Sequence, residues 1–562
     1  MFDYRHGFQP LHEYLRLHAR RTPDKAAVVW YGRRITYAEL DDLSDRFAQS
    51  LRERGVGQGE VVALCMHNCP QYLIAHYGAQ KLGAIVSPCN PDARAYELEH
   101  QLAELDASVV VAGEELLKLL LDSRALRTVA HVFAVRYGDM LPATLAMDVP
   151  PNIRLRHEDA PPLPTCVIDF ADALAQAEAC TPAATIAMDD VCLMAYTSGS
   201  TGLPKGAMIS FECALYKTGA SADGFRLGAD EVILADVALH HISGMMAGLA
   251  LPVYCGATVV LLHRFDAYAV LQAIETCQVS WWHTMAPSLP SVMNCEDAGT
   301  FDLSSLRTTV GTSFGVCLTE TLARRWSRFA NGCLVYEAGY GLSETHTCDT
   351  LMPPDAIKWG TNGKPSPGVE LRIVDPETGC DLSTGQRGEI LLRGPIRYKG
   401  YWLQPEATRT MTLNGWLRTG DVGVLDQEGY LTFVGRIKEM IKVWGYSVFP
   451  EEVESILALH PDVRQAAVVG LPDPDRGEAV QAYVVLKSEA AARMCAGQPG
   501  ERMDQKIIEW CLQHMAYYKV PRTVTFCSGL PASKNGKLLR RVLRDRASAS
   551  SAAPASSTTF LN

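Results

Sequence analysis

The stretch YTSGSTGLPKG, from Tyr196 to Gly206, places three glycines, four Ser or Thr hydroxyls and one lysine in a single turn-rich segment. It begins where the apolar run VCLMAY ends, and this run predicts a buried strand that leads directly into a loop. Backbone N–H groups, hydroxyls and an ammonium group together favour an anion, which predicts phosphate binding. The lysine stands in PKG, whereas the Walker loop requires Gly-Lys followed by Ser or Thr. The stretch is therefore not the Walker loop of an ordinary NTPase.

Bulk composition narrows the class of protein. The 562 residues suffice for two or more domains, and 48% hydrophobic with 20% charged residues is typical of a soluble globular chain. The net charge of -11 argues against nucleic-acid binding, which needs clustered Lys and Arg. The 17 cysteines are scattered and the N-terminal residues lack a signal-peptide apolar region, so we expect a cytoplasmic protein.

Two short stretches of the sequence each have two structural interpretations. Residues 242–262 carry no charge and are long enough to span a membrane, but Pro252 and several glycines interrupt them. We therefore predict a buried helix, a turn at Cys255–Ala257 and a buried strand, with no transmembrane segment. The run CMHNC contains Cys65, His67 and Cys69 but has no second pair of ligands at finger-like spacing, so we predict no metal site there.

The order of patterns along the chain predicts an α/β fold. Apolar strand-like runs alternate with amphipathic helical ones, and Thr36 with Glu39 forms a capping box at one helix start. Short strands after Asn362 predict a β-rich subdomain, and a fresh small α+β unit begins after Gly435. We expect a large N-terminal domain of stacked α/β sheet subdomains over 1–434, a small mobile C-terminal domain over 435–546, and a disordered tail over 547–562.

YTSGSTGLPKG resembles the signature loop of the adenylate-forming enzymes, which include acyl-CoA synthetases, peptide-synthetase adenylation domains and beetle luciferases. The resemblance extends over about residues 10–546. Five further motifs follow in the family's order: ALHHISG (238–244), YGLSET (340–345), WLRTGD (416–421), GRIKE (435–439) and LPASKNGKLLRR (530–541).

The resemblance implies an AMP-forming acid–thiol ligase that uses ATP, Mg²⁺ and coenzyme A. Such an enzyme brings a carboxylate against a polyanion, so it needs preorganised cationic donors. The nucleotide contacts that the resemblance implies are Thr197, Ser198, Gly199, Ser200, Thr201, Gly202, Lys205, Tyr340, Gly341, Ser343, Glu344, Thr345, Asp421, Arg436 and Lys537.

Three residues take catalytic roles by resemblance. Lys537 bridges carboxylate and α-phosphate oxygens, Lys205 holds the phosphates that leave as pyrophosphate, and His241 positions the carboxylate and gates the thiol tunnel. Glu344 and Thr197 supply hard oxygen ligands for Mg²⁺.

The second half-reaction needs a change of domain arrangement in this family. Lys438 resembles the hinge that absorbs the rotation, and Gly445 and Tyr446 should line the thiol tunnel afterwards. We assign the acyl pocket to His241, Met245, Met246, Ser313, Gly315, Ala338 and Gly339.

The sequence departs from the family pattern in one segment. The family commonly has a GGA-containing stretch where this chain reads VGTSFGVCL (310–318), which puts the contacts of Ser313 and Gly315 in doubt. Ser343 also replaces the threonine that the family usually has, and it keeps the hydroxyl.

The acid is expected to be hydrophobic. Amino-acid-activating members of the family usually carry an aspartate where this chain has Ile242 and Ser243, and we expect no carrier-protein domain to follow. HISGMMAGL indicates an adaptable apolar wall, which favours a medium- or long-chain fatty acid over an aryl acid. An acyl-AMP ligase that loads a carrier protein stays open, as do a nucleotide-binding regulator without activity, peripheral membrane contact, and a monomer or homodimer.

Overall fold

The computed structural model describes residues 2–93, 95–123, 129–179, 185–197, 205–313, 317–396, 399–444, 446–473, 476–495, 502–532 and 538–551. They fall into two compact units. The first comprises Met1–Thr312, Leu318–Leu371 and Leu392–Leu417, and the second comprises Ser313–Cys317, Arg372–Leu391 and Arg418–Asn562.

One seven-stranded sheet of the first unit delivers the phosphate-loop stretch. In order, its strands are β7 (Val167–Asp169), β6 (His131–Val135), β5 (Val109–Gly113), β3 (Val61–Cys65), β4 (Ile85–Pro88), β8 (Val191–Tyr196) and β9 (Gly206–Ser210). All neighbours are parallel except β8 and β9, which are antiparallel. Because β3 and β5 are buried along their whole length, their apolar side chains point to both covered faces of the sheet.

A second seven-stranded sheet lies in the same unit. Its strands, in order, are β14 (Leu334–Glu337), β13 (Thr308–Thr312), β12 (Trp281–Met285), β10 (Val232–Ala235), β11 (Thr258–Leu261), β1 (Ala26–Trp30) and β2 (Arg33–Thr36). Only β2 runs antiparallel to its neighbour. The two sheets confirm the predicted α/β class.

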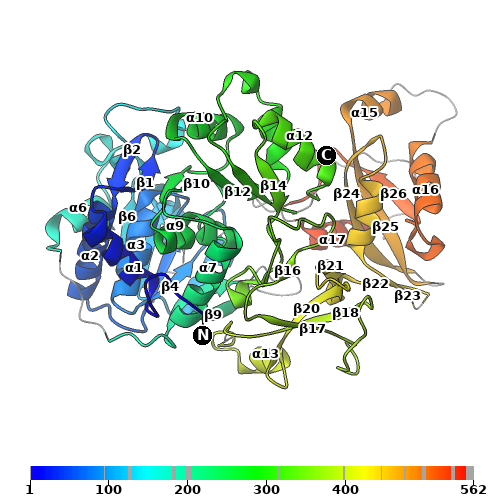
Figure 1. The fold of residues 1–562 in the computed structure, drawn as a ribbon, viewed down its shortest axis with the longest axis horizontal. Helices are drawn as coiled ribbons and strands as arrows, with labels where there is room; N and C mark the ends of the chain where they lie inside the picture. The colour runs from blue at the N-terminus through cyan, green and yellow to red at the C-terminus, as the bar shows by residue number, and fades with distance from the viewer. Residues whose placement is uncertain are drawn as a thin grey trace. The chain divides into compact units, whose positions relative to one another are not determined.

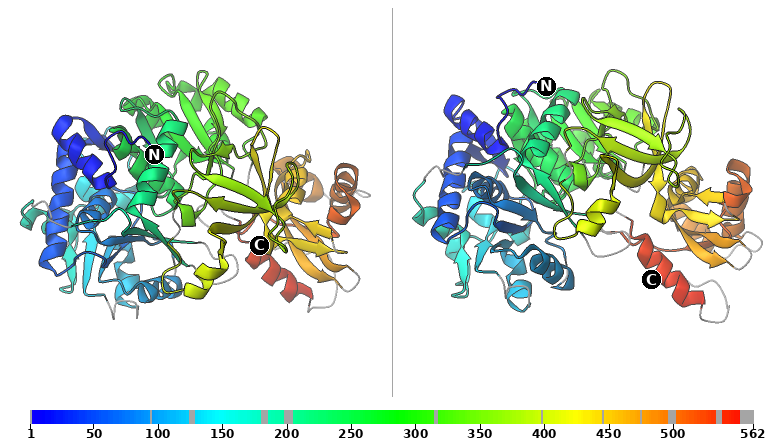
Figure 2. Two further views of the ribbon diagram at one scale, coloured as in Figure 1. Left: turned by 60° about the horizontal axis from the view of Figure 1, so that its bottom comes forward. Right: turned by 90° about the horizontal axis from the view of Figure 1, so that it is seen from below.

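Helices cover both sheets (Figures 1 and 2). They are α1 (Leu11–Arg21), α2 (Tyr37–Glu53), α3 (Pro70–Lys81), α4 (Ala95–Leu105), α5 (Leu117–Leu121), α6 (Phe170–Gln176), α7 (Phe211–Gly224), α10 (Ala267–Cys277), α11 (Ser288–Met293) and α12 (Glu320–Phe329). Helix α3 is buried on every side, and its Tyr72 and Tyr77 hydroxyls donate to the carbonyls of Leu239 and Leu249. Helix α3 therefore links the first sheet to the segment that carries His241.

The uncharged run at 242–262 folds as predicted. It forms α8 (Ile242–Met245), a π-helical turn (Met246–Ala250) and α9 (Leu251–Cys255), and then β11. Gly256 ends α9 at φ 72°, a left-handed conformation that favours glycine. In the part of the chain that the structure describes, no helix is long and apolar enough to cross a membrane.

The predicted β-rich region after Asn362 is a five-stranded sheet. It contains β17 (Glu370–Val374), β18 (Gly388–Arg393), β19 (Thr412–Leu413), β20 (Trp416–Leu425) and β21 (Leu431–Arg436). The two-stranded pair β15 (Thr350–Leu351) and β16 (Lys364–Pro365) and the short helix α13 (Pro405–Thr410) belong to the first unit.

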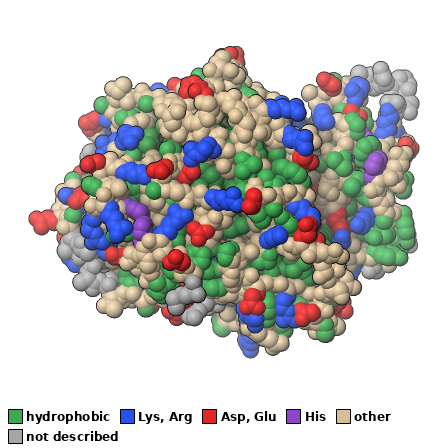
Figure 3. All heavy atoms as spheres, in the orientation of Figure 1, with side chains coloured by type: hydrophobic (Ala, Val, Ile, Leu, Met, Phe, Trp, Pro, Cys, Tyr) green, Lys and Arg blue, Asp and Glu red, His purple; other side chains and the backbone are tan. Residues whose placement is uncertain are grey.

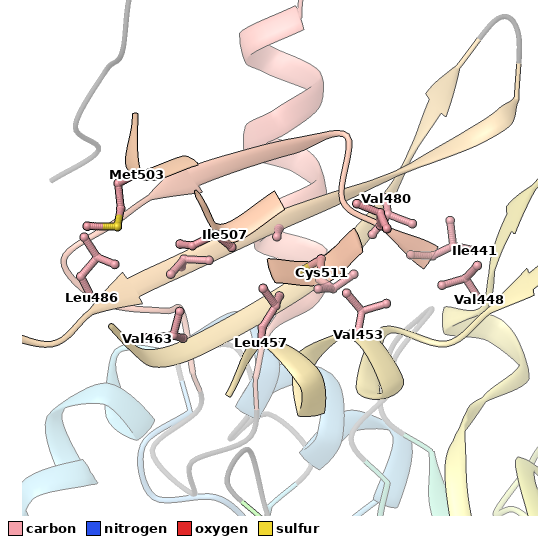
Figure 4. Packing of buried hydrophobic residues seen from close by; sticks show 14 of the residues in the cluster. Ile441, Val448, Val453, Leu457, Val463, Val480, Leu486, Met503, Ile507 and Cys511 are labelled. Carbon is pink, nitrogen blue, oxygen red and sulfur yellow. The ribbon is translucent and has the colours of Figure 1, made fainter. Parts of the chain in front are cut away.

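The second unit has its own sheet and core. The strands are β23 (Tyr446–Val448), β22 (Ile441–Val443), β25 (Gly477–Leu486), β24 (Val463–Asp473) and β26 (Thr523–Phe526), and the helices are α14 (Pro450–Leu457), α15 (Ser488–Cys495), α16 (Met503–His514) and α17 (Arg540–Ser551). Buried side chains such as Val453, Leu457 and Ile507 fill the space between sheet and helices (Figure 4). Helix α17 continues through residues 547–551, the first part of the segment that we predicted to be disordered.

Charge is mixed on the surface that Figure 3 shows. Lys and Arg side chains are interspersed with Asp and Glu over that face.

The N-terminal cap of α2 offers a stability test. The Thr36 hydroxyl accepts from the Glu39 N–H at 3.1 Å, as the capping box predicts. Thr36→Ala should lower the free energy of unfolding by about 1 kcal/mol, because the N–H loses its partner. Thr36→Ser keeps the hydroxyl and is the control. Equal denaturation midpoints for the alanine variant and the wild type in urea would contradict the role of the cap.

Candidate functional site

The phosphate-loop stretch is closed at its base by two hydrogen bonds between Thr197 and Lys205. The Thr197 N–H donates to the Lys205 carbonyl at 2.9 Å, and the Lys205 N–H donates to the Thr197 hydroxyl at 3.4 Å. Strands β8 and β9 hold these two residues opposite each other. The other predicted contacts of this loop lie outside the described residues: Ser198, Gly199, Ser200, Thr201 and Gly202.

Tyr401 connects this loop base to the predicted magnesium ligand. Its hydroxyl donates to Oε1 of Glu344 at 2.6 Å, and the Nζ of Lys205 lies 5.2 Å from the centre of its ring. Residues 400–402 run along β9, where the Trp402 N–H donates to the Gly206 carbonyl at 2.8 Å. The structure therefore brings together Lys205 and Glu344, which the sequence predicted separately, through a residue that the sequence analysis missed.

The YGLSET motif forms a tightly folded loop. The Tyr340 N–H donates to the Thr350 hydroxyl at 2.9 Å, and the Asp349 N–H donates to the Tyr340 carbonyl at 2.8 Å. A Cβ at Gly339 would lie 2.1 Å from the Thr350 carbonyl oxygen, and one at Gly341 would lie 2.4 Å from a backbone nitrogen. Both glycines are required because the two sides of the loop touch through their backbones.

Three consecutive residues after the motif are left-handed. His346, Thr347 and Cys348 have φ values of 61°, 61° and 50°. This conformation is unfavourable for residues with a Cβ, and most of all for β-branched threonine. Such strain persists only where the surroundings determine the backbone, and it concentrates at functional sites.

A buried ion pair supports the strained loop. Lys217 of α7 and Asp349 have no exposed side-chain surface, and their Nζ and Oδ1 atoms lie 2.8 Å apart. The other Asp349 oxygen accepts from the Leu342 N–H at 3.2 Å and from the Thr345 hydroxyl at 2.5 Å. The Thr345 hydroxyl, which we predicted to contact the nucleotide, therefore points to Asp349. Ser343 and Glu344 lie between these anchored positions.

His241 lies at the start of α8, where its ring caps the helix. The Ser243 N–H donates to Nδ1 of His241 at 3.4 Å, and the Ser243 hydroxyl lies 2.8 Å from the same nitrogen. Because Nδ1 accepts, the ring proton of the neutral form is assigned to Nε2. Burial, followed by proximity to His241, lowers the pKa of His240 to about 3 and that of His283 to about 4. Two neutral imidazoles therefore lie near His241.

The other predicted acyl-pocket residues of the first unit come from two places in the chain, shortly after His241 and directly after β14. Met245 and Met246 are buried, with 1% and 2% exposure. Ala338 and Gly339 follow β14 and are half-buried. The described part of Ile242–Leu251 carries no charge, which agrees with an apolar wall.

The second unit holds the predicted ribose ligand. Asp421 of β20 pairs with Arg436 of β21, and the arginine Nε lies 3.3 Å from Oδ1 of the buried aspartate. The Thr419 hydroxyl accepts from the Asp421 N–H at 3.0 Å and donates to the Ile390 carbonyl at 2.8 Å. These contacts fix the aspartate on a β-strand next to a guanidinium group.

The remaining predicted residues of this unit are spread along the chain. Lys438 lies in the 3-10 helix η9 (Ile437–Glu439), directly after β21. Tyr446 is exposed and stacks on Tyr518, with 4.4 Å between ring centres. Ser313 also belongs to this unit. Gly315, Gly445 and Lys537 lie outside the described residues.

Metal binding must rely on few protein ligands. Among the described residues, no group of three His, Cys, Asp or Glu side chains could hold a metal ion. Mg²⁺ is commonly held by one or two carboxylates together with substrate phosphates. The buried Glu344 carboxylate, oriented by Tyr401, fits this mode of binding.

The family of the chain follows from comparison with known sequences. The sequence model described as AMP-binding enzyme matches residues 15–402, and the AMP-binding enzyme C-terminal domain matches residues 452–537. The chain belongs to the AMP-binding enzyme family. This adenylate-forming family is the one that the six motifs predicted.

Individual relatives cover nearly the whole chain. The chain is 31% identical to a 4-coumarate–CoA ligase of Oryza sativa subsp. japonica, over 96% of this chain and 93% of the relative. It is 31% identical to a long-chain-fatty-acid–CoA ligase of Bacillus subtilis (strain 168), over 93% and 92%. The solved structure of an anthranilate–CoA ligase, AuaEII, with anthranoyl-AMP matches with a TM-score of 0.83 and 27% identity, over 97% and 98%.

These comparisons support one reaction class. AMP-binding enzymes use ATP, Mg²⁺ and coenzyme A, and the chain is an adenylate-forming acid–CoA ligase. Ligases of fatty acids and of aromatic acids occur among the relatives, so the relatives do not select the acid.

The contact between Tyr401 and Glu344 can be tested by removing one oxygen. Tyr401→Phe keeps the ring beside Lys205 and removes the donor to the carboxylate. A hydrogen bond to a charged group contributes about 1.5 kcal/mol or more, so the Mg²⁺ concentration for half-maximal pyrophosphate release should rise about tenfold. Tyr268→Phe, at an exposed ring on α10, is the control. An unchanged Mg²⁺ requirement in Tyr401→Phe would show that the hydroxyl does not orient Glu344.

The ion pair between Lys217 and Asp349 predicts a large stability effect. Lys217→Met leaves a buried carboxylate without its cation, which should cost about 3–5 kcal/mol of unfolding free energy. Chemical denaturation of this variant and of Lys118→Met, at an exposed lysine of α5, provides the comparison. Equal losses in the two variants would refute the supporting role of the pair.

Proposed function

We propose that the chain activates a hydrophobic carboxylic acid, with a medium- or long-chain fatty acid favoured over an aryl acid, and transfers the acyl group to coenzyme A. The observation that supports this proposal is the buried, charge-free segment after His241, which contains Met245 and Met246. An acid with an ammonium group would need a carboxylate where the chain has Ile242 and Ser243. Unbranched thioether side chains adapt to a flexible alkyl chain.

In the first unit, the proposed roles concern the phosphates. Lys205 holds the β- and γ-phosphates, and Glu344 with Thr197 would hold the Mg²⁺ that neutralises phosphate charge. The Tyr401 ring and hydroxyl keep Lys205 and Glu344 near each other, as the contacts of the described residues support. Ser343 and the backbone of Tyr340 and Gly341 contribute the remaining contacts to the nucleotide.

In the second unit, the proposed roles concern the ribose and the reaction centre. The Asp421 carboxylate accepts from the ribose hydroxyls, and Arg436 contacts the ribose or the α-phosphate. Lys537 donates to the carboxylate and to the α-phosphate oxygens, where negative charge develops in the transition state. The proposed domain boundary between residues 434 and 435 lies inside the second compact unit, which also contains Arg372–Leu391 and residues 418–434, and Lys438 is the proposed hinge.

The reaction has two balanced steps. A carboxylate oxygen, positioned by His241, attacks the α-phosphorus, and the bond from this phosphorus to pyrophosphate breaks. After rotation at Lys438, the thiol reaches the site along Gly445 and Tyr446 and loses its proton to solvent water. Its sulfur attacks the acyl carbon, and the bond from this carbon to the AMP oxygen breaks, which yields the thioester and AMP.

Two alternatives concern the same chemistry. The acid could be aromatic, as in the relatives that act on 4-coumarate and anthranilate by name. The acceptor could be a carrier protein in place of coenzyme A.

Pyrophosphate release should be measured with ATP over straight-chain, aryl and amino acids, with and without coenzyme A. Activity with amino acids alone, or no acceleration by coenzyme A, would overturn the proposal.

The role of Lys537 gives a sharper test. Lys537→Ala should lower ATP–pyrophosphate exchange about 100- to 1,000-fold, by analogy with the loss of one oxyanion donor. Thioester formation from supplied acyl-adenylate should persist, because this step no longer needs a donor at the α-phosphate. Lys534→Ala, in the same short segment, is the control. Wild-type exchange in Lys537→Ala would remove this lysine from the reaction centre.

A further inference from the structure

Arg540 lies among three glutamates from two other elements of the second unit. It begins α17, while Glu439 belongs to η9 and Glu451 and Glu454 belong to α14. Its Nη2 lies 2.7 Å from a Glu454 oxygen, its Nε donates to the other Glu454 oxygen at 3.2 Å, and its Nη1 lies 2.9 Å from Glu451. Nη1 also forms an ion pair with Glu439.

The cluster is largely shielded from water. The side chains of Arg540 and Glu439 are each 12% exposed, and that of Glu454 is 17% exposed. Burial raises the pKa of Glu451 to about 7, Arg540 opposes this shift, and repulsion from Glu454 and Glu439 adds to it. Three carboxylates therefore gather around one guanidinium group, whose planar fork can satisfy several of them at once. Without the arginine, these carboxylates would repel one another.

The cluster connects two parts of the chain with predicted functions, the Lys537 segment and the residues around Lys438. Arg540 follows Lys537 by three residues, and Glu439 is the neighbour of Lys438. The Leu539 N–H donates to the Pro531 carbonyl at 2.8 Å, and Leu538 pairs with Ala532, so the ends of the segment that contains Lys537 meet. Arg540 thus ties the base of this segment to the residue next to the predicted hinge.

We propose that Arg540 is a positioning residue for adenylate formation: it fixes the base of the Lys537 segment to Glu439 beside the hinge. The inference rests on the proposed role of Lys537 in the first half-reaction. The contacts to Glu454 and Glu451 join α17 to α14, which stabilises the unit in any case. The contact to Glu439 is different because it reaches the hinge element.

The test separates the two half-reactions in the full-length protein. ATP–pyrophosphate exchange reports adenylate formation, and thioester formation from supplied acyl-adenylate and coenzyme A reports the second step. Arg540→Ala should lower the kcat of exchange about 10- to 100-fold, the range expected when a reacting group shifts by about 1 Å. The KM for ATP and the thioester step should stay within about threefold, and Arg540→Lys should recover part of the loss.

Two further variants sharpen the test. Arg541→Ala is the matched control, since Arg541 is 77% exposed and its partner Asp545 lies one helical turn away. Glu439→Gln removes only the charge at the hinge, and it should lower exchange about three- to tenfold with an unchanged melting temperature. Glu439→Gln also tests the contact between Arg540 and the hinge element if Arg540→Ala does not fold.

Distinct results would overturn the inference. A parallel loss in both half-reactions, together with a lower melting temperature, would assign Arg540 to stability alone. Exchange at the wild-type rate in Glu439→Gln would show that the contact with the hinge element does not matter. Absence of exchange in the wild-type protein with every acid would refute the proposed function and the inference with it, and this result is distinguishable because it appears without any substitution.

Discussion

The buried ion pair between Lys217 and Asp349 is the constraint on which the nucleotide motif of the first unit depends. Neither side chain is exposed, so removal of one charge would leave the other without compensation. Asp349 also accepts from Leu342 and Thr345, and these contacts hold the loop across three left-handed residues. Glu344 therefore occupies a fixed place, and Tyr401 can connect its carboxylate to Lys205. A solvent-exposed pair could not impose this geometry, because exposed pairs contribute little.

The second unit also contains a shielded charge cluster, but with a different ratio of cations to carboxylates. In the first unit one lysine faces one aspartate, whereas Arg540 faces three glutamates. A single ammonium suits a fully enclosed pair, while the guanidinium fork can serve several carboxylates from different elements. In both units the loop with the proposed function is closed at its base by backbone hydrogen bonds, between Thr197 and Lys205 and between Pro531 and Leu539. In the second unit, Arg540 directly follows Leu539, so its ion pairs lie next to this closure.

Local patterns were sufficient for much of the fold and for part of the site. The Thr36–Glu39 capping box and the helix–turn–strand at 242–262 depend on residues close together in sequence. Each of the six motifs is also a short continuous stretch. Tyr401 and Glu344 are 57 residues apart, and Lys217 and Asp349 are 132 apart, so no periodicity signals these pairs. No sequence pattern predicts the left-handed run at His346–Cys348, because it contains no glycine. Tertiary contacts, which single-sequence patterns do not encode, determine these features.

The proposed division of charge along the chain explains why a hydrophobic acid suits this site. The predicted phosphate and ribose residues include Lys205, Glu344, Asp421 and Arg436, whereas burial lowers the pKa of His240 and His283 near His241, so that these two imidazoles are neutral. Under the proposed function, an apolar wall would keep water from the reacting carboxylate and strengthen its attraction to cationic donors, because electrostatic interactions weaken in water. A charged substituent on the acid would have to be buried there without a partner, at a cost of several kcal/mol. Under the proposed function, selectivity for apolar acids and activation of the carboxylate would then have the same physical origin.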